Sequence, residues 1–89
     1  MPPVSINLGT LPSGTSSVAA GINNQGAIAG SSGTAAFKLH AVIWQKDGDI
    51  TDLGTFGGDT STATATNNRG QVVGASNPNG LLEAFLWTP

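Results

Sequence analysis

Three short blocks of sequence recur along the chain after 43 to 45 residues. The blocks keep their order, and the spacing drifts by one residue at a time, so the length changes fall in the loops between them. The 89-residue chain is therefore predicted to be a single module, residues 1–89, of two tandem repeats of about 44 residues. The matching blocks are Leu8-Gly9-Thr10-Leu11 with Leu53-Gly54-Thr55-Phe56, Asn23-Asn24-Gln25-Gly26 with Asn67-Asn68-Arg69-Gly70, and His40-Ala41-Val42-Ile43-Trp44 with Glu83-Ala84-Phe85-Leu86-Trp87.

Each repeat is predicted to contain four short strands and no helix. Thr and Ala alternate over residues 61–66 with the period of two that marks a strand. The Asn-Asn-x-Gly block predicts a tight hairpin, because asparagine opens turns through its side chain and glycine accepts positive φ. Glycines within the strands (Gly9, Gly30, Gly54 and Gly74) indicate bulges or close backbone approach. The predicted strands are Val4–Thr10, 17–22, 27–31, 41–44, 49–55, 61–66, 71–75 and 84–87.

Four strands in about 44 residues is the size of a β-propeller blade. The chain opens with a fourth strand, Val4–Thr10, continues through a complete blade (residues 16–55) and ends on an incomplete one (residues 61–88). An unpaired strand edge promotes aggregation, so we expect Val4–Thr10 to complete the second blade of a neighbouring copy by strand swapping (velcro closure). Propellers have 4 to 8 blades, which allows a dimer, trimer or tetramer and favours a six-bladed homotrimer. A monomeric eight-stranded β-sandwich or barrel is the alternative.

Composition supports a folded protein that needs a partner. A hydrophobic content of 38% and a net charge of -2 do not fit a disordered chain. A chain this short buries little surface, and the absence of cysteine removes disulfides and thiolate metal sites. Oligomerisation is the remaining common means of stabilisation.

Several partners are excluded by the sequence. Lys38, Lys46 and Arg69 are the three basic residues and form no basic patch, so no nucleic-acid partner is expected. No apolar run approaches the roughly 20 residues that span a bilayer, so no membrane partner is expected. The start of the chain carries no signal-peptide pattern.

Residues 53–58, 66–74 and 83–87 together resemble the HAF-type bacterial repeat family of extracellular proteins. The His-Ala-Phe triplet of that family is split here between His40-Ala41-Val42 and Glu83-Ala84-Phe85, and Pro12-Ser13 stands where the family has Gly-Gly. The resemblance covers residues 4–88 and implies an exported bacterial protein without enzymatic activity. Members usually carry more than two repeats, so a fragment, a designed chain and a naturally minimal form stay open.

No catalytic or cofactor site is expected. His40 is the single histidine, no Gly-x-Ser-x-Gly motif is present, and Glu83 replaces His40 in the second repeat. We therefore interpret His40 as a strand-edge residue that hydrogen-bonds a neighbouring loop rather than as part of a Ser-His-Asp triad. Asp47, Asp49 and Asp52 form a weak calcium candidate, but Asp-Gly followed by a strand is more typical of a hairpin turn.

The candidate ligand-binding residues are few. Trp44 and Trp87 occupy equivalent positions and are interpreted first as core and second as stacking platforms for a sugar. Asp59 and Arg69 are the exposed polar candidates for contact with a partner. We predict a self-assembling, non-enzymatic scaffold, with a carbohydrate-binding, lectin-like propeller and a monomeric β-sandwich binding domain as alternatives. His40 and Glu83 complete the candidate ligand-binding residues.

Overall fold

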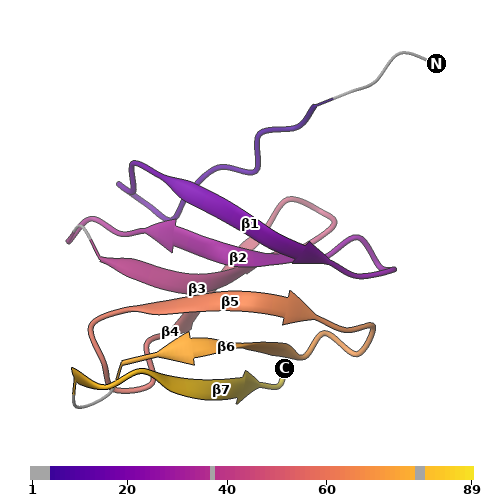
Figure 1. The fold of residues 1–89 in the computed structure, drawn as a ribbon. Coiled ribbons are helices and arrows are strands. Elements are labelled where there is room, and N and C mark those ends of the chain that lie inside the picture. Colours follow the sequence, from indigo (N-terminus) through magenta and orange to yellow (C-terminus); the bar gives the residue numbers. More distant parts are fainter. Residues whose placement is uncertain (1–4, 37, 78–79) are drawn as a thin grey trace.

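The computed structural model describes residues 5–36, 38–77 and 80–89. Within these residues it contains seven strands in two antiparallel sheets and no α-helix (Figure 1). The first sheet has the order β1-β2-β3-β4 and the second has the order β5-β6-β7. The strands are β1 (Ser17–Ile22), β2 (Ile28–Gly33), β3 (Leu39–Trp44), β4 (Ile50–Gly54), β5 (Ser61–Thr66), β6 (Val72–Ser76) and β7 (Glu83–Trp87).

The hairpin predicted from Asn-Asn-x-Gly is present in both sheets. In the first sheet, Asn23 Oδ1 accepts hydrogen bonds from the backbone N–H groups of Gln25 and Ala27, both at 3.0 Å. Gly26 closes the turn with a φ of 81°, a conformation that glycine adopts without steric cost. Asn67 and Gly70 repeat this arrangement between β5 and β6.

The pairing of β1 with β2 is the same as that of β5 with β6 after a shift of 44 residues. Ala19 pairs with Gly30 and Gly21 with Ala29, just as Ala63 pairs with Gly74 and Ala65 with Val73. Both hairpins carry a β-bulge at this point, as the glycines within the strands indicated. The predicted repeat is therefore also a structural repeat.

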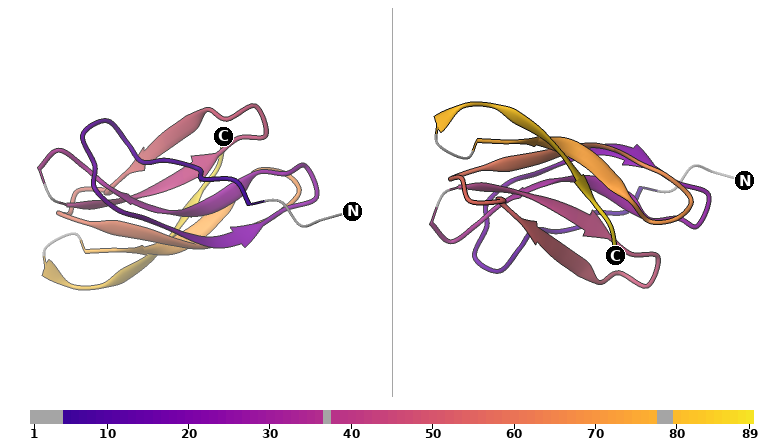
Figure 2. Two further views of the ribbon diagram at one scale, coloured as in Figure 1. Left: turned by 90° about the horizontal axis from the view of Figure 1, so that it is seen from above. Right: turned by 90° about the horizontal axis from the view of Figure 1, so that it is seen from below.

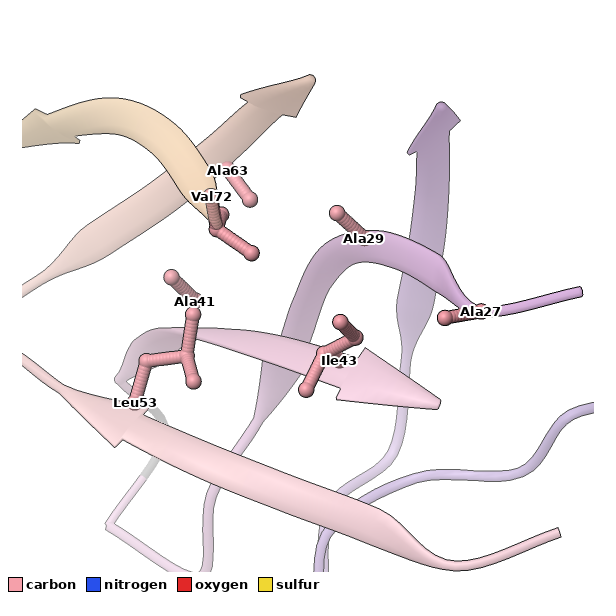
Figure 3. Close-up of a cluster of buried hydrophobic side chains, with 7 residues drawn as sticks. All are labelled: Ala27, Ala29, Ala41, Ile43, Leu53, Ala63 and Val72. Carbon is pink, nitrogen blue, oxygen red and sulfur yellow. The ribbon is translucent and has the colours of Figure 1, made fainter. Parts of the chain in front are cut away.

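The two sheets pack face to face, and the main core lies between them. Figure 1 shows the second sheet below the first, with β5 against β1, β2 and β3. The core side chains are small or branched, which lets the sheets approach closely (Figure 3). They are Ala29, Ala41, Ile43 and Leu53 from the first sheet, Ala27 just before β2, and Ala63 and Val72 from the second sheet.

Each sheet also has an outer face, which points away from the other sheet. On the first sheet, this face carries Val42 and Trp44, which pack with Leu8, Leu11, Ile28 and Ile50. On the second sheet, it carries Val73 and Leu86, which are 45% and 60% exposed. Within the described residues, the two outer faces thus differ, since only the first is covered.

The predicted first strand differs from the structure. Residues 5–10 form no strand, and Val4 lies outside the described residues. A strand needs a neighbouring edge for its backbone hydrogen bonds, and this segment instead crosses the outer face of the first sheet (Figure 2, left). The other seven predicted strands are confirmed, with β1 and β5 at the predicted bounds and the remainder shifted by one or two residues at one or both ends. None of the described residues belongs to a helix of sufficient length and apolarity to cross a membrane.

Candidate functional site

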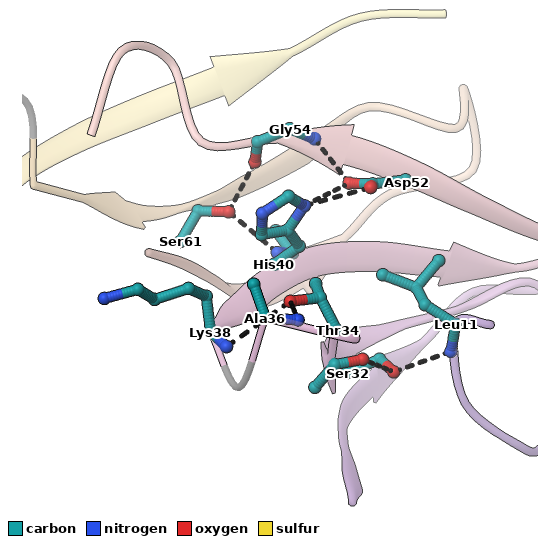
Figure 4. A network of polar contacts seen from close by, with 11 residues as sticks. Leu11, Ser32, Thr34, Ala36, Lys38, His40, Asp52, Gly54 and Ser61 are labelled. Atoms are coloured by element: carbon teal, nitrogen blue, oxygen red, sulfur yellow. Dashed lines mark hydrogen bonds and ion pairs between the residues drawn. The ribbon is translucent and has the colours of Figure 1, made fainter. Parts of the chain in front are cut away.

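His40 pairs with an aspartate across two strands of the first sheet. Its Nδ1 atom lies 2.9 Å and 3.0 Å from the two carboxylate oxygens of Asp52 on β4 (Figure 4). The same carboxylate accepts the backbone N–H of Gly54 at 2.8 Å. The His40 side chain thus contacts the neighbouring strand. Within the described residues, its hydrogen-bond partner is the Asp52 carboxylate and not a serine hydroxyl.

Two of the three acids of the calcium candidate have carboxylates engaged in separate contacts. Asp47 Oδ1 accepts the backbone N–H of Asp49 within the hairpin turn, while Asp52 is held by His40. The described residues contain no group of three or more His, Cys, Asp or Glu side chains arranged to hold a metal ion.

The two tryptophans have different environments. Trp44 is 2% exposed on the outer face of the first sheet, and its buried Nε1 has no hydrogen-bond partner among the described residues. Trp87 is half-buried and packs against the core between the sheets. Because no face of the Trp44 ring is open in this chain, Trp87 is the tryptophan that a ligand could reach.

A cleft of about 270 Å³ lies between the sheets at the end where the Asn-Asn turns are found. Ala27 and Ile43 contribute its apolar lining, together with Trp87. Arg69 and the amides of Asn23, Gln25, Gln45 and Asn68 supply the polar lining. The fold therefore places Trp87 and Arg69, which the sequence singled out separately, around one cleft.

The remaining two candidates lie elsewhere. Glu83 is exposed at the start of β7, opposite Ser76, and Asp59 is exposed in the turn before β5. Neither residue lines the cleft that holds Trp87 and Arg69.

The hydrogen bonds between the two Asn-Asn turns run in one direction, from the first repeat to the second. Asn23 Nδ2 donates to the backbone oxygen of Asn67, and the backbone N–H of Asn24 donates to Asn68 Oδ1, both at 2.8 Å. Each of these bonds joins residues 44 positions apart. One Asn-Asn turn therefore presents donors where its counterpart presents acceptors.

Ser61 forms a third connection between the sheets. Its Oγ accepts the backbone N–H of Ala41 at 2.7 Å and donates to the backbone oxygen of Gly54 (Figure 4). Ser61 is 1% exposed, whereas Ser17, its counterpart in the first repeat, is exposed. The sequence did not predict the role of Ser61 or the hydrogen bonds of the asparagines between the sheets. The available signal was that Ser17, Asn23 and Asn24 each recur after 44 residues.

Comparisons of the chain with protein-family models, with curated proteins and with solved structures found no match.

Proposed function

We propose that the chain is a self-assembling scaffold module in which residues 4–10 of one copy pair with β7 of the next. The observation that carries this proposal is the outer edge of β7, which has no strand partner within the described residues. The equivalent edge of β3 is paired with β4. An open edge is a template for strand addition.

The segment that precedes the first sheet matches β4 in local conformation. Gly9 and Gly54 have φ angles of 84° and 82°. Asn7 Oδ1 accepts the N–H of Gly9 at 3.0 Å, as Asp52 Oδ1 accepts the N–H of Gly54. Leu8 packs on the outer face of the first sheet, and Leu53 packs in the equivalent core between the sheets.

Transfer of the β3–β4 register gives the expected pairing. Ala41 pairs with Gly54 and Trp44 with Ile50, so Ala84 is expected opposite Gly9, and Trp87 opposite Ser5, of a second copy. Glu83 and Asn7 would then stand where His40 and Asp52 stand in the first sheet. The amide of Asn7 can donate to the carboxylate of Glu83, so this pairing is chemically compatible.

Head-to-tail contacts of this kind form rings when the rotation closes. Two repeats per chain and the usual 4 to 8 blades of a propeller favour three chains in a six-bladed ring. The resemblance to HAF-type repeats supports an exported, extracellular scaffold in a bacterium. The assembly itself is the proposed function, without a catalytic or cofactor requirement.

The mass of the full chain in solution tests this proposal. Light scattering and native mass spectrometry should give three times the 8.9 kDa mass of one chain. A single-chain mass at every concentration would contradict self-assembly and support the monomeric β-sandwich. A dimer or tetramer would retain self-assembly and overturn the trimer.

Ile6→Pro tests strand addition more directly. Ile6 is 79% exposed in one chain, so the substitution should leave the fold of that chain intact. Proline has no backbone N–H and is poorly accommodated in a paired strand, so the variant should lose the assembled form. Ile6→Thr is the matched control, because it retains the N–H group and a β-branched side chain, and it should assemble.

A second candidate function is carbohydrate binding in the cleft between the sheets. The observation that favours it is the placement of the Trp87 indole, Arg69 and several amides around one space of about 270 Å³. An aromatic ring offers an apolar surface to a sugar ring, and amide and guanidinium groups bond to hydroxyl or carboxylate oxygens. Fold alone does not assign this role.

Backbone-amide NMR with a panel of neutral and acidic monosaccharides tests this second candidate. Binding should shift the signals of Arg69 and Gly70 saturably, and Arg69→Gln should weaken it. Lys38→Gln, which changes a cation outside this cleft, is the control. No saturable shift with any sugar of the panel would contradict the candidate.

A further inference from the structure

We infer that the outer face of the second sheet is the docking surface for the outer face of the first sheet in a second copy. This inference rests on the proposed self-assembly and adds a face-to-face contact to the edge contact described above. The occupant is identified by equivalent positions within the chain itself. The apolar side chains and hydrogen-bonding groups that this docking would use are each equivalent, by the repeat, to groups in the contact between the two sheets of one chain.

The apolar side chains are the first indication. Val73 and Leu86 are 45% and 60% exposed on the second sheet. Their counterparts in the first sheet are Ala29 and Ile43, which are 0% and 1% exposed because the second sheet covers them. The second sheet thus exposes the kind of surface that the first sheet buries.

The matching surface lies on the first sheet. Its outer face carries Ile28 and Trp44, whose counterparts Val72 and Trp87 pack in the core between the sheets. The outer face of the second sheet in one copy can therefore pack on the outer face of the first sheet in another copy. This contact would be equivalent to the one between the two sheets within a chain.

The asparagine turns have the groups needed to continue their hydrogen bonds. Asn68 Oδ1 accepts the N–H of Asn24 at 2.8 Å, whereas no hydrogen bond to Asn24 Oδ1 is recorded within the described residues. In the assembly, the N–H of Asn68 would donate to Asn24 Oδ1 of the second copy. Asn67 Nδ2, which donates to Oε1 of the partly buried Gln71 at 2.9 Å in one chain, would instead donate to the backbone oxygen of that copy's Asn23.

Ser17 supplies the third contact. Ser61 Oγ is held between Ala41 N–H and Gly54 oxygen, and the repeat carries these three positions to Ser17, Ala84 and Gly9. Ser17 of the second copy would accept the backbone N–H of Ala84 of the first copy. The same hydroxyl would donate to the backbone oxygen of Gly9 in the second copy. The hydroxyl is exposed in one chain and has no hydrogen bond recorded within the described residues.

The contact is directional, since donors on the second sheet meet acceptors on the first. It therefore joins unlike surfaces and leaves the same two surfaces available for the next copy. This geometry is the one that a closed ring requires, and it excludes an isologous contact, in which one of these faces packs on the same face of a second copy.

Sedimentation equilibrium over a dilution series tests the contact with the full-length chain. Asn24→Ala and Ser17→Ala should each weaken association about fivefold, which corresponds to one lost neutral hydrogen bond. The circular dichroism spectrum of the dissociated chain should stay unchanged. Asn24→Asp, which keeps an acceptor oxygen, should associate more strongly than Asn24→Ala, and Ser16→Ala is the matched control on the neighbouring exposed position and should associate like the wild-type chain.

The outcomes separate the two proposals. Unchanged association of Asn24→Ala and Ser17→Ala, while the wild-type chain assembles, would overturn this docking surface and leave self-assembly standing. A wild-type chain that stays single at every concentration would overturn both. Equal weakening by Ser16→Ala would also overturn the assigned contacts, because that side chain has no counterpart in them.

Discussion

Gly30 and Gly74 stand at the closest backbone approach in their sheets. A Cβ atom on Gly30 would overlap the backbone oxygen of Val18, and one on Gly74 would overlap that of Thr62. Both sites lie beside the bulge in the preceding strand, where an extra residue bends the chain. An aromatic ring also packs over each glycine, Trp44 in the first sheet and Phe85 in the second.

Gly30→Ala should lower the free energy of unfolding by about 1–3 kcal/mol, the usual cost of overpacking a buried site. The added methyl group must displace backbone rather than the end of a flexible side chain. Chemical denaturation monitored by circular dichroism measures this change. Gly33→Ala in the same strand is the control, because the nearest atom to its new Cβ would be Ser16 Oγ at 3.5 Å, an ordinary contact. Equal losses for the two variants would contradict the explanation.

At the scale of elements, the hairpin turns are the part of the fold that the sequence predicts best. Asn23 and Asn67 fix the two equivalent hairpins through their side-chain oxygens, and this chemistry is local enough to be predicted from sequence. That residues 5–10 form no strand within the chain could not be predicted in the same way, because a strand forms only where a neighbouring edge pairs with it, and local sequence does not report that edge. The His40–Asp52 pair was also missed as a pair, since it depends on the register between β3 and β4.

The cleft illustrates the same limit for the candidate site. Arg69 belongs to a turn and Trp87 to a strand end, and only the packing of one sheet on the other brings them together with Ile43. The burial of Trp44 likewise depends on Leu8 and Leu11, which reach it from a segment outside the sheet. Residue type suggested both tryptophans as candidates, but tertiary packing separates their environments.

Asn23→Ala should destabilise the chain by about 1–2 kcal/mol, because it removes two turn bonds and the bond to Asn67 on the other sheet. Asn23→Asp keeps the acceptor for both turn bonds and loses only the donor to Asn67. It should therefore cost less than Asn23→Ala, and the difference isolates the turn. Urea denaturation of the two variants, at the same protein concentration, gives the free energy of unfolding of each. Equal losses for the two variants would assign the main role to the bond between the sheets.

For the whole molecule, the face of the first sheet that contacts the second sheet is buried, but the equivalent face of the second sheet has no sheet packed on it within the described residues. Within the described residues, the inner faces bury Ala29 and Ile43 against Ala63 and Val72, while the equivalent apolar surface of the second sheet stays exposed at Val73 and Leu86. Exposed apolar surface of this kind marks an interaction site or an aggregation hazard. The proposed ring of copies would bury this surface and would continue the directional hydrogen bonds between the repeats from one copy to the next.

Self-assembly should make thermal stability depend on protein concentration. Copies that bind only in the folded state stabilise it by mass action, so the unfolding midpoint of the wild-type chain should rise as concentration increases. Leu86→Lys should abolish this rise, because it places a charge on the surface that the next copy would cover. Leu86 is 60% exposed in one chain, so the midpoint of the variant should match that of the wild-type chain at high dilution. Differential scanning calorimetry over a hundredfold range of concentration distinguishes the cases, and a concentration-independent midpoint for the wild-type chain would contradict assembly through this face.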